Sequence, residues 1–482
     1  MAAAPGQREP SDAYDLLIIG GGINGTGIAR DAAGRGLSVL LAERGDLAGF
    51  TSSSSTKLIH GGLRYLEYYE FRLVREALAE RERLLRLAPH VIWPLRFVLP
   101  HDEGLRPAWM LRLGLFLYDH LARLRTLPGS HGVDLRSSAY GAPLQRRLKR
   151  GFVYSDCWVE DSRLVVLNAM DARERGGTER TIRATAVVNA AGPWVSETLG
   201  GTLGVNSRAA VRLIKGSHIV VKRLFDGDQA YILQQPDKRI IFAIPYERDF
   251  TLIGTTDVPY EGEPGPVTIS ESETDYLCGC INRSFDTTLT PADVVWSYSG
   301  VRPLYDDAAE NASAVTRDYV LDVEDQGGTA AVLSVFGGKI TTYRRLAEHA
   351  LEKLKPYFPH LKKAWTGDAV LPGGAMKDAD FDRFLAELRA ERPFLPEETA
   401  RRLARAYGTR TRDIVGTARS MADLGEVFDG GLTAAEVDYL RTEEWAVTAD
   451  DILWRRSKLG LRTGAESASR LAAYLDRRAE AA

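Results

Sequence analysis

A glycine-rich segment near the start of the chain constrains the fold more than any other feature. It runs from Asp15 to Gly36 and reads DLLIIGGGINGTGIARDAAGRG. Its apolar run, 16–19, is typical of a parallel strand buried on both faces. Gly20, Gly22 and Gly25 then satisfy the pattern G-x-G-x-x-G, in which glycine permits a tight turn, close approach of the backbone to a pyrophosphate and close helix–strand packing. The segment therefore predicts a dinucleotide-binding turn.

The residues that follow support this prediction. A helix from about Asn24 directs its free N–H groups and positive dipole end at a phosphate. Leu37 to Leu41 reads as a second strand, and Glu43 follows it about 20 residues after the glycines, where an acid can accept hydrogen bonds from the adenosine ribose. This first motif leaves open whether the dinucleotide is FAD or NAD, and a merely structural glycine turn is the alternative.

Composition narrows the classes of protein. A length of 482 residues suggests two or three domains, and a formal net charge of −3 argues against a nucleic-acid-binding surface. The three cysteines, Cys157, Cys278 and Cys280, lack the spacing of a metal or redox pair, so we expect reduced thiols. The eight histidines form no recognisable metal motif, and no G-x-S-x-G motif points to hydrolysis. We therefore expect no metal site.

Three further expectations concern the N-terminal segment, membrane spans and one amphipathic segment. Residues 1–12 lack the apolar core of a signal peptide and predict a loose tail. No apolar run is long enough to cross a bilayer, which favours a cytosolic protein or one that lies on a membrane. The segment 105–124 places apolar side chains on one helical face and arginines elsewhere, so it fits either a helix in a membrane interface or an ordinary core-facing helix. The apolar residues are Leu105, Trp109, Leu113, Phe116, Leu117 and Leu121, and the arginines are Arg106, Arg112 and Arg123.

The rest of the chain divides by pattern. The segment 71–87 predicts an amphipathic helix. Strand-like runs separated by Gly, Asp and Pro dominate 217–256 and indicate a mostly antiparallel sheet. From Asp368 onward the pattern changes to helices, among them 396–407, and Thr448 to Asp451 resembles a capping box that starts a final helix.

Two later segments repeat the strand, small-residue turn and helix of the first. They are VVNAAGPWV, 187–195, and LSVFGGKITTYRRLAEHALEKL, 333–354. Gly337 and Gly338 allow close approach of the backbone, and a helix start near Lys339 can stabilise negative charge on a flavin. Distant segments that share one cofactor pocket favour FAD over a nicotinamide nucleotide. The alternative is that both are routine strand–helix turns.

Several ordered motifs together resemble the family of FAD-dependent glycerol-3-phosphate dehydrogenases, respiratory enzymes that bind membranes peripherally and reduce quinone. The resemblance covers nearly the whole chain, from about Asp15 to TADDILWRRSKLG. The motifs are IIGGGINGTGIARDAAGRGLSVLLAE, TSSSSTKLIHGGLRYLE, GFVYSDCWVEDSRLV, VNAAGPWV, LIKGSHIVV, IGTTDVPY, YSGVRPL, TRDYVL and SVFGGKITTYRRLAEHALEKL.

The resemblance implies an α/β fold: a glutathione-reductase-like FAD-binding Rossmann domain, an antiparallel β-rich substrate domain and an α-helical C-terminal domain. The expected boundaries are 13–88, 150–210 and 300–365 for the FAD-binding domain, 89–149 and 211–299 for the substrate-binding domain, and 366–482 for the helical domain. One departure stands out, because only the short bridge ERTIRATA precedes Val187 where the family has a longer stretch.

The implied reaction is oxidation of sn-glycerol 3-phosphate to dihydroxyacetone phosphate, with hydride moving from C2 to flavin N5 and electrons passing on to a quinone. The dianionic phosphate requires fixed positive charge, and the planar fork of arginine suits it. By resemblance Arg302 and Arg317 bind the phosphate. Arg64, Tyr65 and Thr255 are the other expected substrate contacts.

The resemblance and side-chain chemistry together assign the remaining site residues. His218 is the preferred general base because imidazole titrates nearest neutral pH, with His60 as the competing candidate, more suited to packing around the flavin. Lys339 holds a substrate oxygen or stabilises the reduced flavin. The expected FAD-binding residues are Gly20, Gly22, Asn24, Gly25, Glu43, Thr51, Ser52, Ser53, Lys57, His60, Gly61, Gly192, Gly337, Gly338, Lys339 and Thr341.

The expected partners are glycerol 3-phosphate, a quinone and a membrane surface at the inner face of the cell membrane, with a homodimer possible in principle and no nucleic acid. Three alternatives remain open at this point. The first is the same oxidation with oxygen as acceptor, and the second is an amino-acid or amine oxidase of the same flavin superfamily. The third is an inactive flavin-binding module on a membrane surface.

Overall fold

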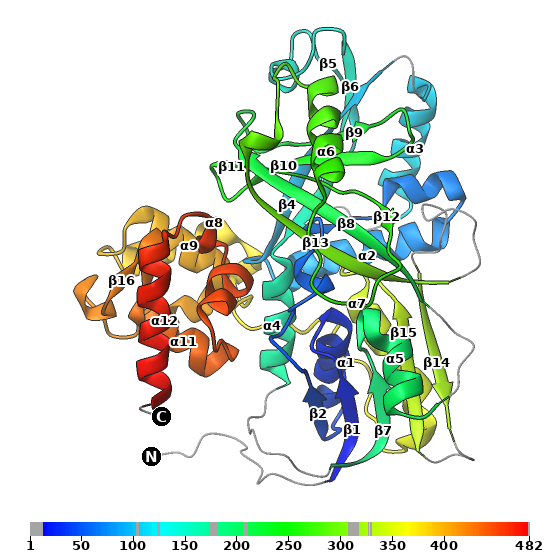
Figure 1. The fold of residues 1–482 in the computed structure, drawn as a ribbon, viewed down its shortest axis with the longest axis vertical. Helices are drawn as coiled ribbons and strands as arrows, with labels where there is room; N and C mark the ends of the chain where they lie inside the picture. Colours follow the sequence, from blue (N-terminus) through cyan, green and yellow to red (C-terminus); the bar gives the residue numbers. More distant parts are fainter. Residues whose placement is uncertain are drawn as a thin grey trace.

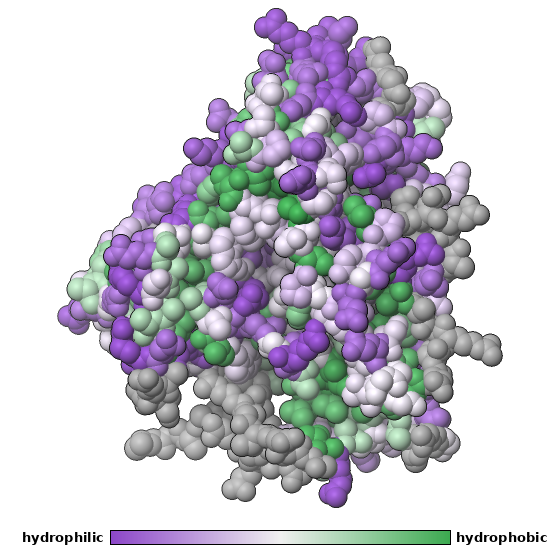
Figure 2. All heavy atoms as spheres, viewed as in Figure 1, coloured by the Kyte–Doolittle hydropathy of each residue, from purple (hydrophilic) through white to green (hydrophobic). Residues whose placement is uncertain are grey.

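The structure is a computed structural model whose described residues form two large sheets, a two-stranded sheet and a group of C-terminal helices. Figure 1 shows a smaller sheet at one end, a larger sheet at the other, and the C-terminal helices beside α4 (Asp161–Asp171). Figure 2 shows that predominantly hydrophilic side chains cover the far end of the larger sheet. The structure describes residues 13–102, 106–122, 126–172, 182–205, 211–306, 318–325, 327 and 330–480.

The smaller sheet contains the glycine-rich segment. Its strand order is β14-β15-β7-β1-β2, with parallel pairing throughout except for the β14–β15 edge. Leu16 and Ile18 of β1 are fully buried, whereas Leu17 is half-buried, so one face of this strand is packed more fully than the other. The strands are β1 (Ala13–Ile19), β2 (Val39–Ala42), β7 (Arg183–Asn189), β14 (Tyr319–Glu324) and β15 (Ala331–Gly337).

Helices α1 (Ile23–Gly34) and α7 (Tyr343–Leu354) pack against each other and against this sheet. Their apolar residues join those of β1, β7 and β15 in one core, which includes the fully buried Ile28 and Leu346. A parallel sheet with packed crossover helices is the Rossmann arrangement that the sequence predicts. This part of the predicted fold is confirmed.

The larger sheet follows the order β12-β8-β11-β10-β9-β4-β6-β3, with β13 paired to β8 and β5 to β6. Its pairings are antiparallel except for β4 with β9, as the strand-like runs of 217–256 predict. The strands are β3 (Leu58–Ile59), β4 (Ile92–His101), β5 (His131–Asp134), β6 (Arg150–Val159), β8 (Val211–Lys222), β9 (Ala230–Gln234), β10 (Ile240–Tyr246), β11 (Phe250–Gly254), β12 (Val258–Pro259) and β13 (Val294–Tyr305).

Two of these strands lie at the expected domain boundaries: β6 falls within the range expected for the FAD-binding domain, 150–210, and β13 crosses the boundary at residue 300. Both β6 and β13 pair within the larger sheet. Helices α2 (Phe71–Leu87), α3 (Ala108–His120) and α6 (Glu271–Ser284) accompany this sheet, and α2 has the bounds that its amphipathic pattern predicts. Of the short bridge before Val187, residues 179–181 lie outside the described residues, and 183–186 form the first part of β7.

The C-terminal region is helical, as predicted, and has its own apolar core. Thr448 and Asp451 exchange the bonds of a capping box, because the Asp451 N–H donates to Thr448 Oγ1 and the Thr448 N–H to Asp451 Oδ2. They start only the short helix η12 (Asp451–Arg456), and a further helix follows it. The helices are α8 (Phe381–Glu391), α9 (Glu397–Tyr407), α10 (Thr411–Val415), α11 (Ala434–Glu444) and α12 (Ala465–Glu480), with the short strands β16 (Val427–Phe428) and β17 (Leu432–Thr433).

Three general features of the described residues bear on function. None of the described helices combines the length and the apolarity that a membrane span needs. Within the same ranges, no three His, Cys, Asp or Glu side chains are grouped so that they can hold a metal ion. Cys157, Cys278 and Cys280 are buried free thiols.

Candidate active site

The turn between β1 and α1 has the close contacts of a dinucleotide turn. Gly20 has φ of +112°, and a Cβ there would lie 2.5 Å from the carbonyl oxygen of Ala190. A Cβ on Gly25 would lie 1.9 Å from the carbonyl oxygen of Gly20. At Gly22 a Cβ would approach only the Ser52 hydroxyl, at 3.1 Å. Sterics therefore require glycine at positions 20 and 25, whereas Gly22 keeps the backbone accessible to a ligand.

Polar side chains from two other segments meet this turn. Glu43, which follows β2, accepts hydrogen bonds from the Gly21 N–H at 2.7 Å and the Gly45 N–H at 2.9 Å. Ser52 accepts one from the Ile23 N–H, the first of α1, at 3.1 Å. The backbone donors of the turn therefore face an acid and a hydroxyl, in the place where a helix N-terminus recognises an anion.

The residues around Asn24 fit FAD. Asn24 Nδ2 donates to the Gly337 carbonyl at 3.2 Å, while its Oδ1 is buried and finds no hydrogen-bond partner among the described residues. Gly338 has φ of +99°, and a Cβ there would lie 3.0 Å from Asn24 Nδ2. Nothing lies within 4 Å of a Cβ placed on Gly192. The Asn24 amide oxygen can therefore accept a hydrogen bond from a dinucleotide, and the glycine backbone at 337–338 and the open space at Gly192 leave room for it.

The serine-rich loop after Glu43 links the glycine turn to the larger sheet. Thr51 donates to the Val301 carbonyl of β13 at 2.6 Å, and Ser53 donates to the Phe50 carbonyl at 3.1 Å. With Ser52 bonded to the start of α1, this loop contacts the larger sheet and the helix that packs on the smaller sheet. It is an ordered part of the site rather than a linker.

Lys57 ends this loop in a buried ion pair. Its Nζ lies 2.8 and 3.0 Å from the Asp161 carboxylate and donates to the Ser53 carbonyl at 3.1 Å. Both charged side chains are fully buried. Lys57 therefore places a buried positive charge beside the site and joins the loop to α4. Its expected contact with the cofactor stays a prediction.

A second group of predicted residues gathers around the start of α7. Lys339 Nζ lies 3.8 Å from the centre of the Tyr65 ring, a cation–π contact. Thr341 Oγ1 accepts the His60 N–H at 3.4 Å. The Gly61 N–H donates to the Tyr118 hydroxyl of α3 at 2.8 Å. The loop 60–65 and the turn 337–341 therefore lie side by side.

His218 on β8 is held from two sides. Its ring stacks on Tyr298 of β13 with centroids 4.7 Å apart and an interplanar angle of 16°. Its Nε2 lies 3.0 Å from Thr56 Oγ1, and its buried Nδ1 has no partner among the described residues. Burial, together with the charges of Lys57 and Arg302, holds the pKa of His218 well below its usual value. The imidazole is therefore neutral at neutral pH.

Arg302 and Thr255 lie near His218 in the same sheet. An Arg302 N–H donates to the Thr256 carbonyl at 2.8 Å, and its guanidinium pairs with Asp257 at 2.7 Å. A Cβ on Gly216, between them on β8, would lie 2.5 Å from the Arg302 guanidinium and 2.9 Å from Thr255 Oγ1. The structure therefore brings a neutral imidazole, a guanidinium and a hydroxyl to one region of the larger sheet.

The other expected substrate residues are placed differently. Arg64 donates to the Tyr68 hydroxyl at 3.3 Å and is the chain neighbour of Tyr65, over whose ring Lys339 lies, and its expected contact with the substrate stays a prediction. Arg317 lies outside the described residues. The contacts of Thr51, Ser52 and Thr56 connect the loop 51–57 to β13, to the start of α1 and to His218.

Sequence reasoning missed two neighbours of the site, Asp161 and Tyr298, and did not pair the Thr56 hydroxyl with His218. Asp161 stood inside a family-like motif, but the pattern gave no role to its carboxylate. Tyr298 faces His218 only because β13 pairs with β8 in the register Tyr298 to His218. No local signal indicates that register.

Comparisons with known proteins agree with this geometry. The model of the family "FAD dependent oxidoreductase" matches residues 15–344, and that of the "C-terminal domain of alpha-glycerophosphate oxidase" matches 364–480. The chain is 52% identical over 489 residues to the aerobic glycerol-3-phosphate dehydrogenase of Escherichia coli K12, covering 96% of this chain and 97% of that one. It is also 52% identical over 472 residues to the D-erythritol 1-phosphate dehydrogenase of Brucella abortus, covering 92% and 94%.

A solved structure is similar over the same extent. The glycerol-3-phosphate dehydrogenase of Bacillus halodurans, complexed with FAD, is 26% identical with a TM-score of 0.72, and the match covers 96% of this chain and 94% of that one. The sequence-based identification of the family and of its cofactor is thereby confirmed. The chain belongs to the FAD-dependent oxidoreductase family, in the group that resembles glycerol-3-phosphate dehydrogenase along its whole length, and FAD is its cofactor.

Proposed function

We propose that this protein oxidises sn-glycerol 3-phosphate to dihydroxyacetone phosphate. The observation that carries the proposal is the neutral, buried imidazole of His218 in the same sheet region as the Arg302 guanidinium and the Thr255 hydroxyl. A phosphate ester of an alcohol needs a cation for its phosphate and a base for its hydroxyl proton. The E. coli and B. halodurans relatives, whose names carry this activity, support the choice of substrate.

Phosphate binding is assigned to Arg302, with Arg317 as its expected partner. The Arg302 side chain is 24% exposed, so an arriving phosphate can reach it. Its contacts with Asp257 and the Thr256 carbonyl fix the direction of the guanidinium before substrate binds. A preoriented planar fork can donate two hydrogen bonds to phosphate oxygens at low entropic cost.

Proton removal is assigned to His218. Because its pKa is lowered, the ring is in the proton-accepting form at neutral pH. In the tautomer whose Nε2–H donates to Thr56 Oγ1, the unpartnered Nδ1 carries the lone pair and is the atom that accepts the proton of the C2 hydroxyl. Stacking on Tyr298 restricts rotation of the ring and so orients this atom.

Residues of the glycine turn, together with Asn24, Gly192, Gly337 and Gly338, would hold FAD. When bound, FAD supplies the acceptor for the two electrons that leave C2. Lys339, fixed above the Tyr65 ring, provides positive charge at the start of α7, where negative charge develops during the reaction.

The test is the visible spectrum of the purified protein before and after anaerobic addition of glycerol 3-phosphate. Bleaching of a flavin band supports the proposal. D-erythritol 1-phosphate belongs in the same panel as a second candidate substrate, because the Brucella relative named for it is as similar as the E. coli one. Bleaching only by amino acids or amines, or a colourless protein that stays inactive after FAD is added, would refute it.

The proposed electron acceptor is a membrane quinone. Hydrogen peroxide yield, measured with and without a soluble quinone analogue, tests this. A yield equal to the substrate oxidised, and unchanged by the analogue, would mean that oxygen is the acceptor.

A cluster of exposed apolar side chains supports peripheral membrane binding and is named here the α3 patch. On α3 it comprises Trp109, Met110, Leu113 and Phe116, and on the adjacent segment Tyr68, Tyr69 and Phe71. Helix α3 packs on η2 (Leu63–Tyr68), which joins the two parts of the patch. The opposite side of α3 is buried through Leu115 and Tyr118, so the helix serves both the core and the surface.

The partner of the α3 patch is proposed to be an anionic lipid surface. Aromatic and aliphatic side chains with flanking arginines, Arg106 and Arg112, suit the headgroup region. Tyr118 of the same helix bonds the Gly61 N–H beside the proposed flavin site, so a membrane bound here would lie close to that site. A dimer formed through the same patch is the competing outcome of the vesicle experiment described below.

A further inference from the structure

The loop from Glu43 to Gly49, named here the adenosine loop, is bonded to the glycine turn at two points. Glu43 accepts the Gly21 N–H at 2.7 Å, and the Ala48 N–H donates to the Gly21 carbonyl at 3.2 Å. A Cβ on Gly21 would lie 2.9 Å from side-chain atoms of both Glu43 and Leu47. The conformation of this loop therefore sets the position of the acid and of the turn that are expected to hold the adenosine half of FAD.

The C-terminal helical region also bonds to the adenosine loop, through Asp46. The two carboxylate oxygens of Asp46 accept hydrogen bonds from two nitrogens of Arg456, each at 2.7 Å. Arg455 donates to Asp46 as well. The Arg456 side chain is fully buried, and among the described residues Asp46 is the only carboxylate that pairs with it. Bidentate, charge-assisted bonds of this kind fix both partners in direction as well as distance.

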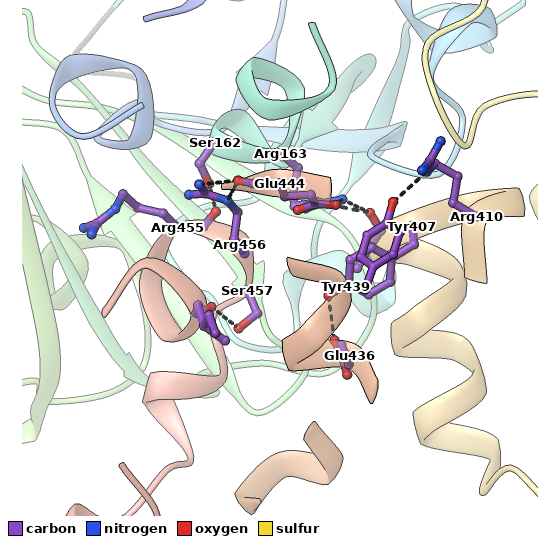
Figure 3. Close-up of polar contacts among 12 residues, drawn as sticks. Ser162, Arg163, Tyr407, Arg410, Glu436, Tyr439, Glu444, Arg455, Arg456 and Ser457 are labelled. Carbon is purple, nitrogen blue, oxygen red and sulfur yellow. Dashed lines mark hydrogen bonds and ion pairs between the residues drawn. The ribbon is translucent and has the colours of Figure 1, made fainter. Parts of the chain in front are cut away.

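Arg456 is itself held by the C-terminal region. Its Nε and one terminal nitrogen donate to the Glu444 carbonyl at 3.1 and 2.6 Å. The Glu444 carboxylate pairs in turn with the buried Arg163 of α4, at 2.9 Å for one of its two bonds. Figure 3 shows Arg163 and Arg456 approaching Glu444 from different elements. The Arg163–Glu444 pair thus docks the two regions without touching the adenosine loop.

We propose that Asp46, through Arg456, is a positioning residue for FAD, so that the C-terminal helical region takes part in holding the cofactor. The Asp46–Arg456 pair preorganises the adenosine loop for the cofactor. The Asp46–Arg456 ion pair is named here the clamp. With the clamp present, the adenosine loop is already fixed when FAD binds. Without the clamp, the binding of FAD must order the loop. The clamp makes no contact with the reacting atoms and acts only through the adenosine loop.

The test compares Asp46→Asn with Glu444→Gln in the full-length holoprotein. Asp46→Asn keeps the shape of the side chain and removes its charge. Glu444→Gln weakens the docking of the same two regions but leaves the loop and the Glu444 carbonyl in place. FAD release after dilution is followed by recovery of flavin fluorescence, and the melting temperature of each apoprotein reports structural damage.

We expect Asp46→Asn to release FAD about tenfold faster than the unsubstituted protein, which corresponds to the entropy of ordering about one backbone residue. Glu444→Gln should lower the melting temperature at least as much but change FAD release less than threefold. Equal release rates in Asp46→Asn and the unsubstituted protein would overturn the proposal. Equal acceleration in the two variants would also overturn it, because general loosening would then be the cause.

A milder variant covers the case in which Asp46→Asn does not fold. Arg455→Gln removes the second, partly exposed arginine from Asp46, together with its ion pair to Asp451, and keeps the bidentate pair. It should accelerate FAD release about threefold with little change in melting temperature. Unchanged release in this variant, with Asp46→Asn unfolded, would refute the role of the clamp.

Discussion

Substitution of two residues in the α3 patch should detach the protein from membranes. Leu113 and Phe116 are 51% and 50% exposed, so about half of each side chain remains available to a lipid surface. Full burial of a Leu or Phe side chain is worth about 1.5–3 kcal/mol. Half of that, summed over both residues, is about 1.5–3 kcal/mol, or a fall of about 10- to 150-fold in the membrane partition coefficient.

The assay is co-sedimentation of the double variant Leu113→Ser/Phe116→Ser with vesicles that contain an anionic phospholipid. A matched control is Val427→Ser/Val447→Ser, because these side chains are 45% and 75% exposed but lie in the C-terminal region, outside the α3 patch. The control should bind vesicles as the unsubstituted protein does. Oxidation of glycerol 3-phosphate with a soluble dye as acceptor should be unchanged in both variants, which excludes unfolding as the cause.

Two results would refute the reasoning. Equal vesicle binding by the α3 variant and the control would show that the patch does not contact lipid. Loss of a dimer in the α3 variant, measured by analytical ultracentrifugation without vesicles, would show that the patch is covered by a second copy of the chain.

Three further predictions concern the site itself. Arg302→Ala should raise KM for glycerol 3-phosphate about 10- to 150-fold, the equivalent of a lost hydrogen bond to a charged group, while the flavin absorbance is retained; an unchanged KM would remove Arg302 from the phosphate site. His218→Gln should lower kcat by about 10²- to 10⁴-fold. Since the pKa of His218 lies well below its usual value, the unsubstituted protein keeps the base unprotonated at pH 6, and kcat at saturating substrate should stay level between pH 8 and 6; a decline of kcat with a midpoint near pH 6.5 would contradict this. Asp161→Asn leaves Lys57 charged and buried without its partner, so unfolding should become easier by about 3–5 kcal/mol, measured by denaturant titration; a change below about 1 kcal/mol would mean that water reaches Lys57.

The parts of the fold that depend on local patterns were predictable. The strand, turn and helix at 13–34 follow from an apolar run and glycines whose spacing only a few backbone shapes accept. Helix α2 follows from its amphipathic period, and the C-terminal helices follow from theirs. Such signals are contained in about ten to twenty neighbouring residues, and a chain of any topology carries them.

The assignment of strands to sheets was less accessible. β6 and β13 lie where the expected domain boundaries fall, yet both pair within the larger sheet. The alternation of apolar and polar residues along a strand indicates which face is buried. It does not indicate with which other strands that strand pairs. The Thr448–Asp451 capping box is a similar case, since the bonds form but the helix they start ends after one short turn.

The site shows the same division. The sequence identified residue types and one cofactor from motifs, because a dinucleotide turn needs glycine at set spacing and a phosphate needs arginine. The partners that set their chemistry are distant in the chain: Lys57 and Asp161 are 104 residues apart, and Asp46 and Arg456 are 410 apart. The depressed pKa of His218 likewise arises from burial and from charges on other segments.

The sequence by itself therefore determined the dinucleotide turn and the amphipathic helices, which short-range spacing encodes, and its ordered motifs carry the resemblance that implies the family, FAD and the candidate residues. Only the tertiary structure decided that His218 stacks on Tyr298, that Lys57 is neutralised by Asp161, and that α3 leaves an apolar face exposed. The physical reason is that burial and electrostatic pairing depend on distances in space, and those distances are fixed only when strands and helices far apart in the chain pack together.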